Sequence, residues 1–258
     1  MAAGPMEQFE IRPLFGDHPL FSIGGHPIFF TNQALWMIIV TGAVSLFMTF
    51  AMSRRSLVPN RAQSMAELAY EFVANMINTA AGEEGLRFFP MIFTIFMFVA
   101  TANFMGLLPG SFTVTSQICV TLALTMLIIL TVIVTGFVTH GIGFLKLFVP
   151  KAPIYMLPVL VPLEFISFCT RPMSLSVRLF ANMLAGHTML KVMAGFVVAL
   201  GAMAVTSKAW MAPLSLAPMA LIVAVTGLEI LVAFLQAYVF AILACIYLGE
   251  AIHLHDNH

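Results

Sequence analysis

Residues 172–187 read Pro172-Met173-Ser174-Leu175-Ser176-Val177-Arg178-Leu179-Phe180-Ala181-Asn182-Met183-Leu184-Ala185-Gly186-His187. This stretch lies inside a long apolar segment with Arg178 near its middle. The guanidinium keeps its positive charge at any physiological pH. At the centre of a bilayer that charge costs about 3 kcal/mol on insertion scales. We therefore expect a membrane helix in which this permanent cation has a function.

The composition supports a membrane location for the whole chain. Of 258 residues, 61% are hydrophobic and 9% are charged, and the mean hydropathy is +1.02. Soluble domains carry about 25% charged residues. The chain is predicted to be an all-α polytopic membrane protein, one membrane domain over 1–258, surrounded by lipid. The net charge of zero gives no support to nucleic-acid binding.

Cofactor and metal sites are not predicted. Cys119, Cys169 and Cys245 lie far apart in apolar runs and are interpreted as small core residues. The ending His253-Leu254-His255-Asp256-Asn257-His258 is interpreted as a solvated tail, since His-x-His at a terminus is weak evidence for metal.

Charges next to the first apolar run predict its orientation. Residues 1–30 form a mixed outer segment, and 31–52 form the first span. Arg54, Arg55 and Arg61 follow it. Basic residues flanking a span stay in the cytoplasm, so the N-terminus is expected outside.

Residues 61–82 are predicted to form an amphipathic helix on the membrane surface. Apolar residues recur there at helical spacing with glutamates and asparagines between them. The apolar members are Met65, Leu68, Phe72, Met76 and Ile77.

A helical hairpin is predicted over 88–138. Its two spans are joined by a turn at Pro109-Gly110-Ser111. Two crossings return the chain to the cytoplasm, and the basic residues of the next loop agree with that side. They are His140, Lys146 and Lys151.

The last third, 160–248, contains two unusually long helical segments. Segments 163–205 and 214–248 would be roughly 60 and 50 Å long as single helices, against a hydrocarbon core of about 30 Å. Either each is split into two spans, or the two form a long, strongly tilted hairpin. Crowded prolines before 163 are expected to delay the first helix, and 249–258 is expected to be a cytoplasmic tail.

Polar residues share faces of these segments. Ser174, Arg178 and Asn182 form one stripe at 100° per residue, with Arg171 and Glu164 near it. His187 points to the opposite face. On the last segment, Thr226, Glu229, Gln236 and Tyr247 share a face.

Structural roles remain open for each of these residues. Asn182 and Gln236 fit interhelical hydrogen bonds, and His187 fits a core histidine. Glu164 fits an ion pair with Arg171, and Arg178 fits neutralisation by Glu229. Ionisable groups that face a bundle interior more often mark an ion path, and histidine exchanges protons near neutral pH.

Three motifs together resemble subunit a of F-type ATP synthases (subunit 6 in mitochondria), and the resemblance spans nearly the whole chain. The motifs are residues 174–187, the run Glu229-Ile230-Leu231-Val232-Ala233-Phe234-Leu235-Gln236-Ala237-Tyr238-Val239-Phe240, and Asn103-Phe104-Met105-Gly106-Leu107-Leu108-Pro109.

The resemblance implies a near-horizontal last hairpin that lies against a rotating ring of c subunits. It implies a large hetero-oligomer with b-type peripheral stalk subunits, in the cell inner membrane, in which this subunit is non-catalytic. The family's essential arginine corresponds to Arg178, its partner asparagine to Asn182 and its last-helix glutamine to Gln236. His187 and Glu229 are exchanged relative to some bacterial members, which points to an alphaproteobacterial or mitochondrial type.

Chain direction divides the polar residues between two half-channels. The outer one would be lined by Asn182, His187, Glu229 and Gln236. The inner one would use Glu164, Ser167 and Tyr247. Arg178 would separate the two and stop protons from passing directly between them.

Two other functions predict different sequence features. A secondary transporter or ion channel with its own substrate site predicts inverted repeats and broken helices, and no convincing internal repeat is found. An intramembrane hydrolase predicts a catalytic motif such as His-Glu-x-x-His or Gly-x-Ser-x-Gly, and neither is present.

Overall fold

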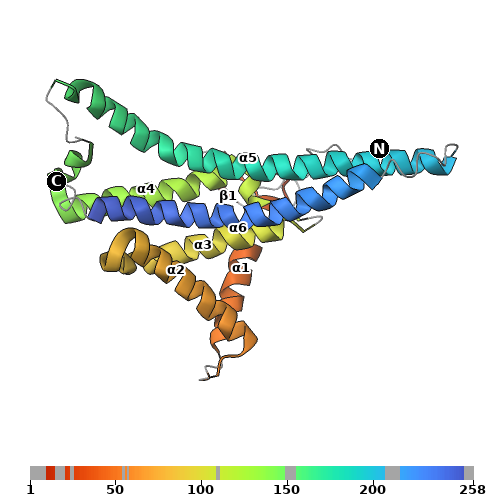
Figure 1. The fold of residues 1–258 in the computed structure, drawn as a ribbon, viewed down its shortest axis with the longest axis horizontal. Helices are drawn as coiled ribbons and strands as arrows, with labels where there is room; N and C mark the ends of the chain where they lie inside the picture. Colours follow the sequence, from red (N-terminus) through yellow and green to blue (C-terminus); the bar gives the residue numbers. More distant parts are fainter. Residues whose placement is uncertain are drawn as a thin grey trace.

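The computed structural model describes residues 10–14, 21–23, 26–53, 56, 58–108, 111–148, 155–206 and 216–252. A small antiparallel hairpin is followed by six α-helices and three short 3₁₀ helices (Figure 1). The elements are β1 (Phe21–Ile23), β2 (His26–Ile28), α1 (Asn32–Met52), α2 (Arg61–Gly85), η2 (Leu86–Phe88), α3 (Phe89–Gly106), η3 (Val114–Ser116), α4 (Ile118–His140), η4 (Gly141–Phe148), α5 (Leu157–Thr206) and α6 (Leu216–Ile252).

The predicted all-α membrane architecture is confirmed. Five helical stretches among the described residues are long and apolar enough to cross a bilayer. They are Asn32–Met52, Arg61–Gly106, Ile118–Leu145, Leu157–Met203 and Leu216–Ile252. The β1–β2 hairpin was not predicted; it precedes the first span, and Phe21 pairs with Ile28 in it.

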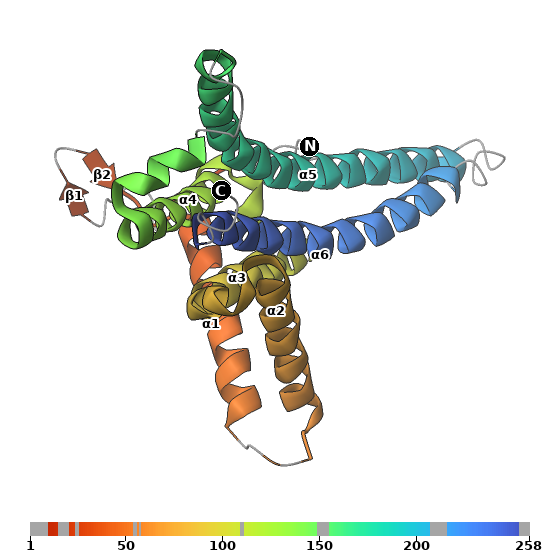
Figure 2. The ribbon, with the colours of Figure 1, turned by 60° about the vertical axis from the view of Figure 1, so that its left-hand side comes forward.

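The two long segments are continuous helices, so the interpretation as four short spans is wrong. The α5 helix has 50 residues and α6 has 37, which correspond to about 75 and 55 Å. Both exceed the hydrocarbon thickness of about 30 Å. The two helices run side by side as one long hairpin in both views (Figures 1 and 2). A hairpin this long fits a bilayer only when strongly tilted.

Proline does not delay α5 as expected. The helix begins at Leu157 and includes Pro158 and Pro162. Proline is tolerated in a first turn because the N–H it lacks has no helical partner there. Further along, each proline removes a backbone hydrogen bond and favours a bend. The first part of α5 indeed bends away from the rest of the hairpin (Figure 2).

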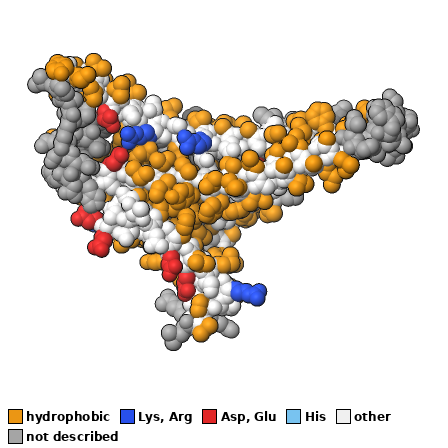
Figure 3. Space-filling view, in the orientation of Figure 1, with side chains coloured by type: hydrophobic (Ala, Val, Ile, Leu, Met, Phe, Trp, Pro, Cys, Tyr) orange, Lys and Arg blue, Asp and Glu red, His pale blue; other side chains and the backbone are white. Residues whose placement is uncertain are grey.

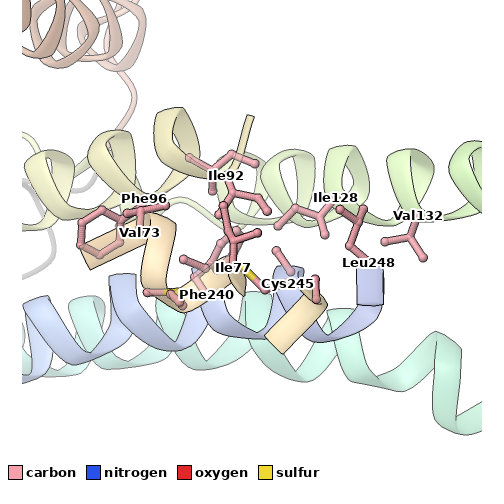
Figure 4. Packing of buried hydrophobic residues seen from close by; sticks show 14 of the residues in the cluster. Val73, Ile77, Ile92, Phe96, Ile128, Val132, Phe240, Cys245 and Leu248 are labelled. Atoms are coloured by element: carbon pink, nitrogen blue, oxygen red, sulfur yellow. The ribbon is translucent and has the colours of Figure 1, made fainter. Parts of the chain in front are cut away.

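The core lies where α6 packs on α2, α3 and α4. Buried side chains from all four helices meet there (Figure 4). They include Val73, Ile77, Ile92, Phe96, Ile128, Val132, Phe240, Cys245 and Leu248. The buried face of α6 is rich in alanine, and small residues let helix backbones approach closely in lipid. Cys245 is a core residue as predicted, whereas Cys119 and Cys169 are exposed.

Helix α2 is present as predicted and extends to Gly85, with a kink at Gly82 (φ 69°, ψ −172°), the residue at which the predicted helix ends. Its apolar residues differ in exposure, since Met76 and Ile77 are buried against the core but Met65 and Leu68 are 62% and 65% exposed. The amphipathic character of this helix and its location on the membrane surface stay predictions.

Polar side chains connect the hairpin to the rest of the bundle. Asn103 of α3 is fully buried, and its Nδ2 donates to the Ala233 carbonyl of α6 at 3.1 Å. The Thr115 hydroxyl donates to Asn103 Oδ1 at 2.8 Å. On α5, the Ser176 hydroxyl donates to Thr121 Oγ1 of α4 at 2.9 Å. These bonds fix the height of both long helices relative to α3 and α4.

Replacing Asn103 tests this role. Asn103→Leu keeps the side-chain size but leaves the Thr115 hydroxyl and Ala233 carbonyl without their partner. We expect a loss of about 1 kcal/mol of unfolding free energy, measured by titrating the purified protein with SDS in mixed micelles. Thr131→Val is the control, because the Thr131 hydroxyl bonds only to the Leu127 carbonyl of its own helix among the described residues. Equal stability of the two variants would contradict the prediction.

Candidate functional site

The antiparallel hairpin brings His187 of α5 opposite Glu229 of α6. His187 Nε2 lies 3.7 Å from Glu229 Oε1, and the two side chains are only 12% and 4% exposed. Both carboxylate oxygens of Glu229 are buried without a hydrogen-bond partner among the described residues. Two ionisable groups are thus enclosed together in an apolar hairpin.

Gly186 provides the space for this pair. A Cβ atom at position 186 would lie 2.6 Å from Glu229 Oε1 and 3.1 Å from its Cδ. Real Cβ atoms essentially never come within 3.0 Å of another atom, so the contact with Oε1 would force the carboxylate to shift. The carboxylate therefore occupies volume that any side chain at position 186 would take.

Gln236 continues the polar face of α6 from Glu229. It is 5% exposed, and its Nε2 is buried without a hydrogen-bond partner in the part of the chain described. Seven residues, or about two helical turns, separate it from Glu229. Asn182 is half-buried on α5 between His187 and Arg178. The structure thus supports the predicted common face of Glu229 and Gln236.

Arg178 lies apart from the His187–Glu229 pair. Its side chain is exposed and lines an open groove of about 480 Å³ between α5 and α6. The other lining residues are Thr170, Arg171, Ser174, Leu175, Val239, Ile242, Leu243 and Tyr247. Nine residues of helix separate Arg178 from His187, about 13 Å along the axis.

Neutralisation of Arg178 by Glu229 is not observed. Glu229 faces His187 instead. Within the described residues Arg178 forms no ion pair and no side-chain hydrogen bond. Its charge is therefore available to a group outside this chain.

A second charged cluster lies at the other end of the groove. Arg171 is 3.7 Å from Glu164 Oε1 and 3.4 Å from Glu250 Oε2. Its guanidinium carbon lies 5.8 Å from the centre of the Tyr247 ring. The ion pair of Glu164 with Arg171, left open by the sequence, is confirmed.

Glu250 was not predicted as a site residue. From the sequence, the last helix was expected to end at residue 248 and residues 249–258 to form a tail. In the structure α6 continues through Ile252. Glu250 follows Tyr247 by one turn, and that spacing on a continued helix would have revealed it. The histidines of the ending lie outside the described residues.

Of the three residues predicted for the inner half-channel, only Tyr247 lines the groove. Glu164 lies outside the lining but contacts Arg171, which is part of it. Ser167 is half-buried on α5, and its carbonyl accepts the Thr170 hydroxyl at 3.1 Å.

The charged side chains stand out from an apolar surface. Figure 3 shows basic and acidic side chains close together over α5, within a broad hydrophobic area. Among the described residues, no group of three or more His, Cys, Asp or Glu side chains could hold a metal ion. The site therefore combines a buried pair able to exchange protons with a fixed cation in an open groove.

Comparison with known proteins agrees with this arrangement. The family described as "ATP synthase A chain" matches residues 34–249. The chain is 55% identical over 250 residues to ATP synthase subunit a of Mesorhizobium japonicum, covering 96% of each chain. It is 55% identical to that of Chelativorans sp. and 52% to that of Rhodopseudomonas palustris, over 98% of this chain and 99% of each relative. These relatives are alphaproteobacterial, as the His187–Glu229 arrangement predicted. The chain belongs to the ATP synthase A chain family.

Proposed function

We propose that this chain is the non-catalytic proton-channel stator subunit of an F-type ATP synthase. Two half-channels load and unload protons on carboxylates of a c-subunit ring and so couple proton flow to rotation and ATP synthesis. The observation that carries the proposal is the separation of the buried His187–Glu229 pair from the exposed, unpaired Arg178 on the same hairpin.

The outer half-channel would be formed by Asn182, His187, Glu229 and Gln236. These residues lie on the side of Arg178 nearer the hairpin tip, which would face the periplasm. An imidazole and a carboxyl group 3.7 Å apart can exchange a proton after a small side-chain movement. At Glu229 and Gln236, buried polar atoms that find no partner within the described segments favour water molecules along this path.

Arg178 would act as the gate between the half-channels. A fixed cation favours the deprotonated form of a carboxylate that passes it. The same charge repels a proton that crosses directly from one half-channel to the other. Because each proton that falls through 100 mV yields about 2.3 kcal/mol, a direct leak would remove the drive for rotation.

The inner half-channel would open near Glu164 and Tyr247, with Ser167 at its edge. The groove that contains Arg178 reaches Arg171 and Tyr247, which gives a protonated carboxyl a route away from the gate. The C-terminal end of α6 would then face the cytoplasm, and the N-terminal segment the periplasm. The bacterial inner membrane and b-type peripheral stalk subunits complete the proposed surroundings.

A secondary transporter with its own substrate site is less well supported. That class places substrates at broken helices near the bilayer centre. The α5 and α6 helices run unbroken through all their described residues.

The gate predicts a strict requirement for arginine. Arg178→Lys keeps a basic residue, but a lysine ammonium can lose its proton in a dehydrated site, whereas a guanidinium does not. We expect coupled transport to be abolished, measured as ATP synthesis driven by a proton gradient in vesicles that contain the whole enzyme. Arg12→Lys, in an exposed pair with Glu10, is the control. Normal ATP synthesis by Arg178→Lys would contradict the gate.

The outer path predicts a slower but tight channel when His187 is removed. His187→Ala should lower proton flux by roughly tenfold or more, since a positioned acid–base group is lost, without an uncoupled leak. Glu229→Gln should have a similar effect, and the double variant should be no slower than the worse single variant because both act on one step. Additive losses, or flux unchanged by His187→Ala, would exclude a shared path.

The space at Gly186 predicts sensitivity to a single methyl group. Gly186→Ala should displace the Glu229 carboxylate and lower proton flux several-fold, although alanine in a helix is otherwise favourable by about 0.5–1 kcal/mol. Gly195→Ala on the same helix is a matched control, because nothing lies within 4 Å of its added Cβ. Passive proton uptake into vesicles measures both. Equal rates for the two variants would show that the Glu229 position is not critical.

A further inference from the structure

Two arginines line the groove between α5 and α6, and they differ in their surroundings. Arg171 lies between Glu164 and Glu250 at 3.7 and 3.4 Å. Arg178 forms no ion pair with any residue that the structure describes. One cation of the groove is therefore compensated, and the other is not.

Most of the contact that holds Arg171 comes from α6. Its Nη1 donates to Glu250 Oε2 at 3.4 Å, and the Tyr247 ring lies one turn earlier on α6. The side chains of Arg171 and Glu250 are 35% and 38% exposed. Partial burial reduces screening by salt, so this pairing is stronger than that of a fully exposed pair.

Because the two arginines are close together, the compensation of Arg171 affects the charge that a carboxylate meets in the groove. Seven residues, or about 10 Å along the axis, separate Arg171 from Arg178 on one stripe of α5. Arg171 already lines this groove, so without its acidic partners it would be a second free cation there. A carboxylate that moved along the groove would then meet two free cations in succession. Each would favour its deprotonated form.

We propose that Glu250 is a positioning residue that, with Glu164, compensates the charge of Arg171 and holds its guanidinium at the inner end of the groove. Arg178 then remains the one uncompensated cation that a rotor carboxylate meets. This inference rests on the proposed function, because it assumes that a carboxylate of another subunit passes through the groove. It assigns to Glu250 a role that does not require it to carry a proton.

Two other roles for Glu250 make different predictions. A purely structural contact between α5 and α6 would be lost whichever partner is removed, so removing both would not restore function. A proton carrier at position 250 would likewise remain lost when Arg171 is also replaced. Only charge compensation predicts recovery when the arginine is removed together with the glutamate.

The first measurement compares Glu250→Gln with Glu250→Asp in the whole enzyme reconstituted in vesicles. Two assays report proton transport. One is acidification of the vesicle interior driven by ATP hydrolysis, and the other is proton uptake driven by a potassium diffusion potential. We expect Glu250→Gln to slow both by roughly two- to fivefold, the range for loss of a partly exposed ion pair. Glu250→Asp, which keeps the charge, should transport faster than Glu250→Gln. Glu84→Gln, at an exposed position near the end of α2, is the matched control.

The second measurement adds Arg171→Gln to Glu250→Gln. Recovery of most of the lost rate supports the inference. A double variant that assembles but is as slow as Glu250→Gln, or a Glu250→Gln variant at the wild-type rate, overturns it. If Glu250→Gln does not assemble, the double variant alone provides the test. Assembly and proton transport by the double variant would support the inference, and their absence would overturn it.

Arg178→Lys, measured in parallel, separates this inference from the function on which it rests. If Arg178→Lys transports normally, the proposed gate fails. If Arg178→Lys is inactive while Glu250→Gln is at the wild-type rate, the gate stands and only the role of Glu250 is wrong.

Discussion

The antiparallel register of α5 and α6 is the constraint on which the site depends. It places His187 opposite Glu229 at one height and Arg171 opposite Tyr247 and Glu250 at another. A shift of one turn, about 5.4 Å, would separate every one of these partners. The register is held by packing and by a few buried hydrogen bonds, chiefly those of Asn103 to Ala233 and of Ser176 to Thr121. The chemistry of the hairpin is therefore set by helices that carry none of its ionisable groups.

Packing in lipid explains why small residues are common on the buried face of α6. Water is absent from the hydrocarbon, so apolar side chains gain little by leaving lipid for protein, and close contact between helices matters more. The buried face of α6 is rich in alanine, and Gly249 lies so close to α2 that a Cβ would be 2.8 Å from the Ala80 carbonyl oxygen. Small residues thus allow the close packing of a helix that also buries the polar side chains of Glu229 and Gln236.

Much of this fold follows from periodicity and hydropathy, because lipid imposes simple rules on span length and charge. The spans and the helical phase of Glu229 and Gln236 were predictable. The end of α6 was not, since Gly249 and Glu250 resemble the start of a polar tail until Tyr247 and Arg171 are seen beside them. The exposure of Met65 and Leu68 was not predictable either, because periodicity identifies an apolar stripe but does not say whether protein or lipid covers it.

Because glycine has no side chain, Gly186 couples the substitutions that this site can accept in evolution. The volume beside the His187–Glu229 pair is shared by three positions on two helices, so substitutions there are coupled in size as well as in charge. Exchange of the acid and the imidazole between the helices keeps the combined volume and the proton chemistry. A larger residue at position 186 would displace the Glu229 carboxylate from its present position. The glycine therefore ties the size of the residue at 186 to the acid that faces it from the other helix.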